Sequence, residues 1–236
     1  MDRDAKFELV ARIFYRKSVP NLWFKILCEN TSETSSILEL GSGSGVGKQN
    51  QLYPKAQEII GIDVDDRVLS NPYLDSSYCG SAYEINKYLN GKKVDIIYSQ
   101  MVAEHIDDAR LFLAAQLQAI KDDGVIIHST VSKYHWVMLI NNLVPKKLKN
   151  WLIMTLGSGR QSEDIFPAQY KLNSLRQLED LSRSHSFSYE VIRQDEPPGY
   201  LRRSIILMLI YTAIHKPLQA IFPALRPTFI FLIRKL

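Results

Sequence analysis

The chain of 236 residues is long enough for one domain with a sizeable buried core, and its 46% hydrophobic and 23% charged residues are ordinary for a globular protein. The formal net charge of +4 is too small to argue for a nucleic-acid partner. Cys28 and Cys79 form no disulfide or metal-binding pattern, so we expect a reducing compartment and no metal site.

The termini and apolar runs bear on localisation. The N-terminus has mixed charges and lacks the apolar core of a signal peptide. No apolar run reaches the roughly 18 residues that suggest a membrane span, since Lys216 and Pro217 interrupt the closest one, Ser204 to His215. We expect a cytoplasmic protein, either free or peripheral to a membrane.

The first part of the chain alternates helices and buried strands. Residues 5–17 have helical spacing, with Phe7, Val10, Ile13 and Phe14 on one face. Short apolar runs predict strands at 37–40 and 58–64, with a helix at 45–52 between them.

The alternation continues through the middle of the chain. The pattern predicts helices at 81–89 and 107–120 and strands at 94–99 and 125–131, with a turn at Asp123-Gly124. Residues 133–170 break the pattern. It resumes with a helix at 174–183, a strand at 188–193, a helix at 203–222 and a strand at 228–236.

This order of elements predicts an α/β fold: a doubly wound, Rossmann-like, mostly parallel seven-stranded sheet with helices on both faces. In such a sheet, ligands bind beyond the carboxyl ends of the strands, near the point where strand order reverses. We expect a single domain for residues 1–236. It would comprise an N-terminal helical cap (1–34), a ligand-binding core (35–131), a lid insertion (132–172) and the C-terminal half of the sheet with an apolar crossover helix (173–236).

The strongest motif is a glycine loop within LELGSGSGVG, residues 38–47. Gly41, Gly43 and Gly45 follow an apolar strand and precede a predicted helix. Glycines at such a place let the backbone turn sharply and approach a ligand closely, and a helix N-terminus favours a polar or anionic ligand group.

Two common nucleotide loops do not fit this spacing. In a P-loop the first Gly would fall on Ser42 and the final hydroxyl on Gln49. In a dinucleotide loop the last Gly would fall on Val46, Lys48 or Asn50. The spacing therefore disfavours an ATPase and a nicotinamide-dependent oxidoreductase.

The remaining pattern is E-x-G-x-G-x-G, formed by Glu39, Gly41, Gly43 and Gly45. It resembles motif I of the class I S-adenosylmethionine-dependent methyltransferases. The resemblance implies that the loop, with Ser42, passes beneath the methionine part of S-adenosylmethionine and that Glu39 helps to position the amino end of that cofactor.

A second acid stands where this family holds the ribose. Asp63 ends the second predicted strand, 22 residues after Gly41, and a carboxylate there can accept both ribose hydroxyls. The resemblance implies this role for Asp63 and a place beside the adenine for Val64. The alternative for Asp63 is a helix N-cap, a role for which Asp65 is better placed.

Two further segments resemble the same family. In CGSAYEIN, Ser81 and Ala82 occupy the place of an acid that bonds the adenine amino group, and a serine lacks the charge-assisted strength of that bond. DIIYSQMVAEHIDD resembles the fourth strand and loop of ubiquinone-biosynthesis-type methyltransferases. By that resemblance, the reactive methyl lies near Ser99, Gln100 and Met101.

Methyl transfer from a sulfonium is a direct displacement, so the protein mainly supplies alignment and electrostatics. A base is needed only when the acceptor keeps its proton, as a hydroxyl does. His105 is the first candidate base and His135 the second. Either histidine can instead be a packing residue, and we expect His128 to be a core histidine.

The acceptor is less defined than the cofactor. The resemblance implies a small-molecule, lipid or glycan acceptor, with oxygen as the expected acceptor atom. Two apolar stretches, 136–144 and 205–214, have basic neighbours, which is typical of interfacial membrane helices but also fits a buried lid and crossover helix. The alternative function is a non-catalytic, membrane-associated accessory protein of the same fold. The sequence leaves the oligomeric state open.

Overall fold

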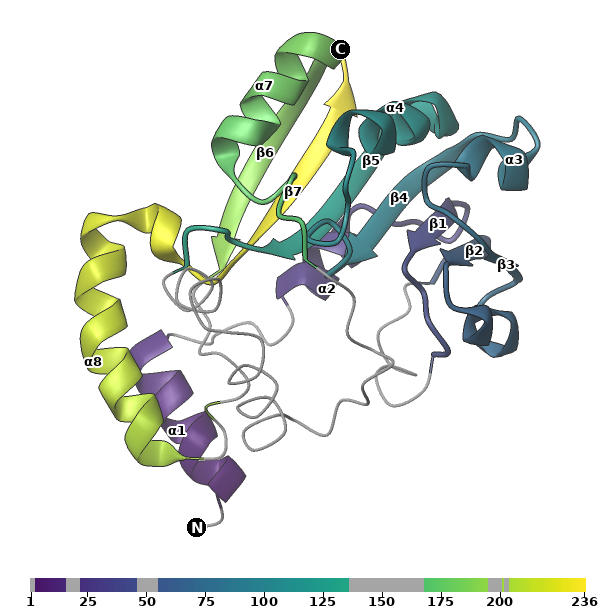
Figure 1. The fold of residues 1–236 in the computed structure, drawn as a ribbon. Helices are drawn as coiled ribbons and strands as arrows, with labels where there is room; N and C mark the ends of the chain where they lie inside the picture. Colours follow the sequence, from purple (N-terminus) through teal and green to yellow (C-terminus); the bar gives the residue numbers. More distant parts are fainter. Residues whose placement is uncertain (1–2, 16–21, 46–54, 136–167, 195–200, 202–203) are drawn as a thin grey trace. The chain divides into compact units, whose positions relative to one another are not determined.

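The structure, a computed structural model, describes residues 3–15, 22–45, 55–135, 168–194, 201 and 204–236. One seven-stranded sheet has the order β3-β2-β1-β4-β5-β7-β6 and is mostly parallel, with one antiparallel hairpin (Figure 1). The strands are β1 (Ser36–Leu40), β2 (Glu58–Asp63), β3 (Ser76–Cys79), β4 (Val94–Gln100), β5 (Ile120–Val131), β6 (Phe187–Gln194) and β7 (Thr228–Lys235).

The described helices are α1 (Arg3–Tyr15), α2 (Leu22–Glu29), α3 (Ile85–Leu89), α4 (Ala109–Ala119), α7 (Leu175–His185) and α8 (Ile205–Ile221), with short 3-10 helices η1 (Asp66–Ser70) and η4 (Pro223–Leu225). β1 pairs in parallel with β2 on one side and β4 on the other, so strand order reverses at β1. The predicted doubly wound fold is confirmed, and its switch point lies at the loops that follow β1 and β4.

One face of the sheet packs against α2. The Trp23 ring meets Tyr98 of β4 edge to face, with ring centroids 5.5 Å apart. Each large apolar side chain buried in this way stabilises the fold by about 1.5–3 kcal/mol. The buried cluster on this face consists of Trp23, Ile26, Leu27, Ile37, Ile96, Tyr98, Val125, Ile127, Ile230 and Leu232.

The opposite face packs against α4. Because side chains alternate along a strand, the residues next to Tyr98 and Ile127, namely Ser99 and His128, point the other way. Phe112 of α4 lies against His128, with ring centroids 5.3 Å apart. The apolar strands are therefore covered on both faces, as their near-continuous hydrophobicity predicts.

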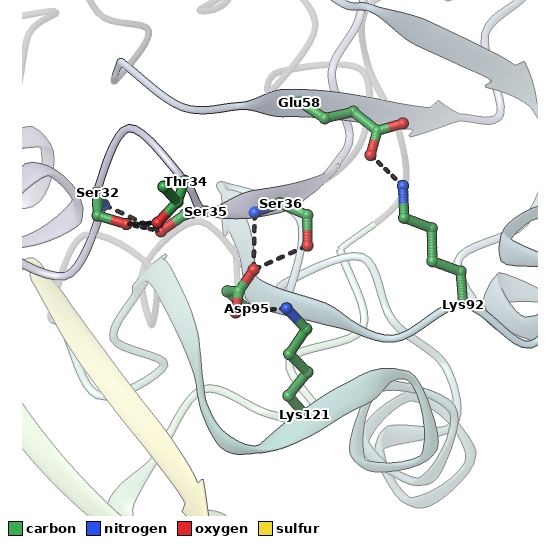
Figure 2. Close-up of polar contacts among 8 residues, drawn as sticks. All are labelled: Ser32, Thr34, Ser35, Ser36, Glu58, Lys92, Asp95 and Lys121. Carbon is green, nitrogen blue, oxygen red and sulfur yellow. Dashed lines mark hydrogen bonds and ion pairs between the residues drawn. The ribbon is translucent and has the colours of Figure 1, made fainter.

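A polar network fixes the register at the amino ends of β1 and β4, the edge opposite the switch-point loops (Figure 2). Asp95 accepts hydrogen bonds from the backbone N and the Oγ of Ser36, at 2.8 and 2.9 Å, and from Lys121 Nζ at 2.7 Å. Burial raises the pKa of Asp95, but the bonds from Lys121 and Ser36 outweigh it and hold that pKa below its ordinary value. A neighbouring ion pair joins Lys92 to Glu58.

The predicted turn at Asp123-Gly124 is wrong, because β5 already begins at Ile120. Ile120 pairs with Val94, and the next pair is Val125 with Ile96, so four residues of β5 stand opposite one residue of β4. This register shift accommodates the turn-forming residues without ending the strand. A Cβ on Gly124 would lie 2.8 Å from the backbone oxygen of Asp95, so the close strand approach requires glycine there.

The chain divides into two compact units, each made of separate stretches. Unit 1 comprises Met1–Pro20, Val131–Pro167 and Arg193–Phe229, and unit 2 comprises Asn21–Thr130, Ala168–Ile192 and Ile230–Leu236. The sequence predicted one domain made of four consecutive stretches, whereas each observed unit combines stretches that are far apart in the sequence. For example, α2 falls in unit 2 rather than in an N-terminal cap. Most of the sheet belongs to unit 2.

Unit 1 contains α1 packed against α8. Their shared core contains Phe7, Val10, Ala11, Tyr15, Leu201, Met208 and Tyr211. The predicted inner face of α1 is only partly correct, because Ile13 and Phe14 point outward, with 60% and 45% of their surface exposed. Among the described helices, none combines the length and apolarity needed to span a bilayer.

Candidate active site

The glycine loop leaves β1 in a conformation that suits glycine. Gly41 N donates to the backbone oxygen of Ile62 at 2.8 Å, which continues the pairing of β1 with β2. Gly41 and Gly43 both have positive φ angles, +76° and +55°. A Cβ on Gly41 would lie 2.3 Å from Val102 Cγ2, so this position also needs the missing side chain for space.

Asp63, the last residue of β2, bonds directly to this loop. Its Oδ2 accepts from Gly43 N at 2.7 Å and its Oδ1 accepts from Asp65 N at 2.9 Å. Each carboxylate oxygen can accept more than one hydrogen bond, so the half-buried side chain keeps acceptor capacity for further hydroxyl groups. The loop after β1 and the acid after β2 are therefore parts of one structure. Asp65, as predicted, caps η1 by accepting from Arg67 N at 2.9 Å.

Asn71 holds the glycine loop in place through hydrogen bonds, and this role was not predicted from the sequence. Its buried Nδ2 donates to the backbone oxygens of Ser42 at 3.3 Å and Gly43 at 3.2 Å, while its Oδ1 accepts from Tyr73 N at 3.0 Å. The available signal was an Asn-Pro pair after η1, which is typical of a turn. That signal does not reveal a contact 28 residues back along the chain.

The loop after β3 lies beside Asp63. Gly80 N donates to the backbone oxygen of Asp63 at 2.7 Å. Ser81 Oγ accepts from Tyr83 N at 3.2 Å, in a local turn. The next residue, Ala82, is half-buried, and Val64 is 60% exposed beside Asp63. The predicted adenine-side residues thus come together around the end of β2.

Tyr83 links this loop to the one after β4. Its hydroxyl donates to the Asp107 carboxylate and accepts from the backbone N of Asp107 at 3.1 Å and of Asp108 at 3.2 Å. Burial and the hydrogen bond to Asp107 raise the pKa of Tyr83. The aromatic side chain therefore fixes the spacing between two of the loops that surround the candidate site.

At the end of β4, the three residues predicted to lie near the reactive methyl have different environments. Met101 has a positive φ of 57°, which is strained for a residue with a side chain, and its N donates to the Ser129 backbone oxygen at 2.8 Å. Gln100 and Met101 are exposed at this edge. Ser99 is fully buried instead and bonds His128 Nδ1 at 2.6 Å. The predicted place of Ser99 beside the reactive methyl is therefore not supported.

The loop after β4 also carries Glu104 and His105. Glu104 is buried, its Oε2 accepts from Thr130 Oγ1 at 2.7 Å, and its backbone oxygen accepts from Gln169 N at 2.7 Å. Asn173 Nδ2 donates to the same Thr130 hydroxyl at 2.7 Å. His105 is half-buried on this anchored loop, with its N bonded to the Val102 backbone oxygen at 2.9 Å. The buried network holds the loop while leaving His105 partly accessible.

His135 does not have the environment of a substrate-facing base. It lies in unit 1 with 1% of its surface exposed, and its Nε2 bonds the Tyr211 hydroxyl at 2.8 Å. Burial and the neighbouring His215 lower the pKa of His135 to about 4. The predicted catalytic role is therefore not supported, since the side chain is occupied in a packed core.

His128 is the core histidine that the sequence predicted. It is fully buried, with Nδ1 bonded to Ser99 Oγ and Nε2 bonded to Gln116 Oε1 at 2.8 Å. The Gln116 Nε2 donates to Phe112 O at 3.1 Å, which leaves its Oε1 to accept from His128. The ring is thus neutral, with its proton on Nε2, and burial lowers the pKa of His128 to about 3.

This burial predicts an acid-sensitive fold. Between about pH 6.5 and 3 the unfolded chain binds a proton on His128 that the folded chain does not, so the free energy of unfolding falls as the pH falls, by up to roughly 1.4 kcal/mol per pH unit. In urea unfolding at pH 7 and pH 5, His128→Gln should show a smaller loss on acidification than the wild type. Ser99→Ala removes the hydrogen bond but keeps the titrating group, so it should retain the wild-type pH slope. An identical slope in His128→Gln would contradict the assignment.

The residues around the switch point fit a ligand with a polar amino-acid end and a ribose. A Cβ on Gly43 would meet no atom within 4 Å, so space lies open beside that glycine. Asp63 offers a carboxylate at the neighbouring strand end, and Gly80 and Ser81 border it from β3. The sequence predicts S-adenosylmethionine at this place, with its methionine part at the glycine loop and its ribose at Asp63.

Comparison with known proteins gives the family. Residues 8–180 match the family model described as "Methyltransferase domain", and the chain belongs to that family. No curated protein matches the sequence significantly.

Solved structures of several enzymes share the fold along nearly the whole chain. The plantazolicin methyltransferase BamL, solved with S-adenosylhomocysteine, is 16% identical, with a TM-score of 0.55 over 99% of this chain and 91% of its own. A SAM-dependent methyltransferase from Archaeoglobus fulgidus is 14% identical, with a TM-score of 0.56 over 97% and 99%. The mycolic acid cyclopropane synthase CmaA1 is 12% identical, with a TM-score of 0.57 over 94% and 88%. The protein is therefore a methyltransferase by its family, and it has the fold of the class I, S-adenosylmethionine-dependent enzymes.

Proposed function

We propose that the protein transfers a methyl group from S-adenosylmethionine to an oxygen atom of a small-molecule, lipid or glycan acceptor. The observation that carries the cofactor part of this proposal is the 2.7 Å bond between Gly43 N and Asp63 Oδ2. It brings the two parts expected to hold opposite ends of the methyl donor into contact at the switch point of the sheet.

The protein's own contribution is binding and alignment. Asp63 would accept hydroxyl groups of the ribose, and the glycine loop would approach the methionine part with its backbone. S-adenosylmethionine, when bound, supplies a methyl group on a cationic sulfur that a nucleophile displaces directly. Gln100 and Met101, exposed at the end of β4, would then border the space where the acceptor lies.

His105 is the residue best placed to take a proton from a hydroxyl acceptor. It is half-buried on the loop after β4, and the Glu104 network anchors that loop. A hydroxyl loses its proton reluctantly, so a base within hydrogen-bond reach lowers the barrier. A base of this kind acts in the transition state and has little part in holding the cofactor.

Replacing His105 with Ala is therefore expected to lower kcat at least about tenfold while leaving the affinity for S-adenosylhomocysteine unchanged. Steady-state kinetics and calorimetry on the same preparation check this. Leu111→Ala, an exposed change on α4, is the control. An unchanged kcat in the His105 variant would remove this residue from the mechanism.

The structural relatives support several acceptor classes. BamL was solved with a plantazolicin analogue, CmaA1 is a mycolic acid cyclopropane synthase, and a third relative, from Haemonchus contortus, is a phosphoethanolamine N-methyltransferase. These relatives favour a small molecule or a lipid as the acceptor of this protein, but they do not distinguish between the two classes. The preference for oxygen rests on the candidate base, because a proton-bearing hydroxyl needs one.

The proposal is tested by incubating the protein with S-adenosylmethionine carrying a labelled methyl group and with separate aqueous and lipid extracts. We expect label in at least one fraction, as an O-methyl product, and loss of that label with Asp63→Ala but not with Asp66→Ala. A protein that binds S-adenosylhomocysteine yet labels no fraction would instead favour the non-catalytic alternative.

A further inference from the structure

In helix α8 of unit 1, most polar side chains face the protein and most apolar side chains face solvent, the reverse of the usual arrangement. Its packed stripe consists of Met208, Tyr211, Thr212, His215 and Gln219, so all its polar side chains except Lys216 point into the protein. Tyr211 bonds His135, and Thr212 bonds the Tyr15 hydroxyl at 3.0 Å. The inner side of the helix is thus held by polar contacts to unit 1.

The outer face of α8 is aliphatic along its whole length. Helix α1 lies beside α8 in unit 1 (Figure 1). It adds further exposed apolar side chains. Exposed apolar side chains repeated along one side of a helix are typical of an interaction site, because globular surfaces rarely keep large apolar patches. The large exposed side chains are Ile206, Leu207, Leu209, Ile210, Ile214, Leu218, Ile221 and Phe222, with Leu9, Ile13 and Phe14 of α1.

The charge of the chain is divided unequally between the two units. Of the 29 Lys and Arg residues, 15 fall in unit 1, against seven of the 25 Asp and Glu residues, which gives unit 1 a formal charge of +8 and unit 2 a formal charge of −4. Between Arg202 and Arg226 the sequence contains four basic residues and no carboxylate. The apolar face therefore belongs to the strongly basic part of the protein.

We propose that the outer face of α8 docks on an anionic lipid bilayer. An exposed aliphatic face within a basic unit matches the two attractions of such a surface, apolar burial at the acyl boundary and electrostatic attraction to anionic headgroups. A nucleic acid would use the charge but not the aliphatic face. At 17 residues, α8 extends for about 25 Å, short of a span. Because its apolar side chains lie on one side only, docking would place the helix in the plane of the interface.

The test is co-sedimentation of the full chain with vesicles of phosphatidylglycerol and phosphatidylcholine at low salt. We expect binding that weakens with added salt and is lost with pure phosphatidylcholine vesicles. The double variant Ile210→Gln/Ile214→Gln, changed at positions 53% and 51% exposed, should bind at least about tenfold more weakly. The matched control is Leu111→Gln/Leu175→Gln, at positions of unit 2 that are 52% and 37% exposed, and it should bind as the wild type does.

Thermal melting and S-adenosylhomocysteine binding show that each variant is folded, and both should be unchanged because the altered side chains point to solvent. This keeps the docking surface separable from the methyltransferase proposal. The docking proposal is overturned if the wild type stays in the supernatant at low salt, or if the α8 variant sediments as well as its control. A dimer that the α8 variant dissociates, without vesicle binding, would assign this face to a second copy of the chain.

Discussion

Replacing Asp63 with Ala is expected to weaken the binding of S-adenosylhomocysteine by about 1–3 kcal/mol, or roughly 5- to 150-fold in Kd. The change removes the carboxylate proposed to accept the ribose hydroxyls. It also leaves Gly43 N and Asp65 N without their acceptor, so the loop after β1 loses its bond to the end of β2. Isothermal calorimetry with the wild type and the variant measures the difference directly.

Two controls separate these contributions. Asp66→Ala removes an exposed acid from the first turn of η1 and should bind as the wild type does. Asp63→Asn keeps one side-chain oxygen for the backbone N–H groups but loses the charge and one acceptor oxygen, so its affinity should fall between those of the wild type and Asp63→Ala. Unchanged affinity in Asp63→Ala would refute the ribose role.

Replacing Gly41 with Ala is expected to lower the free energy of unfolding by about 2–4 kcal/mol. The φ of +76° costs a residue with a side chain about 1–2 kcal/mol, and the new Cβ would lie 2.3 Å from Val102 Cγ2 and force that side chain to move. Urea unfolding measures the loss. Because the crowding comes from one side chain, adding Val102→Ala should recover part of it.

Gly43 and Gly91 form the matched comparison. Both have positive φ, +55° and +80°, and a Cβ on either would meet no atom within 4 Å. Ala at either position should therefore cost stability through the backbone alone. Only Gly43→Ala should also weaken S-adenosylhomocysteine binding, by about tenfold or more, because its Cβ would enter the space assigned to the ligand. Equal affinity in the two variants would place the ligand elsewhere.

The sequence predicted the parts of the fold that local patterns determine. Apolar runs bounded by glycine, proline and charged residues marked the strands, and their alternation with helices predicted the parallel sheet. The glycine spacing and Asp63 predicted two neighbours at the switch point. They are 20 residues apart in sequence yet bonded at 2.7 Å, because consecutive parallel strands end at the same edge.

Features that depend on distant contacts could not be predicted in this way. Asn71 supports the glycine loop through bonds to Ser42 and Gly43, and nothing in its local sequence identifies those partners. Ser99 stands at the strand end where a ligand contact is expected, but strand alternation turns it toward His128. Asp123 and Gly124 resemble a turn locally, whereas the pairs that β5 forms with β4 before and after them keep them within the strand, at a shift of register.

The organisation of unit 1 is the largest departure from sequence reasoning. α1 and α8 are near opposite ends of the chain and pack together, which turns Ile13 and Phe14 outward. The same packing occupies His135, the second candidate base, with Tyr211. Helical periodicity identified both helices, but it could not tell which apolar side of each one is buried.

Calorimetric titration of the wild-type protein with S-adenosylhomocysteine, NAD and ATP tests most directly whether the glycine loop and Asp63 together form a methyl-donor site. We expect saturable binding of S-adenosylhomocysteine with one site per chain, and no heat of binding from NAD or ATP. Binding of NAD in place of S-adenosylhomocysteine, or binding of none of the three, would contradict the account.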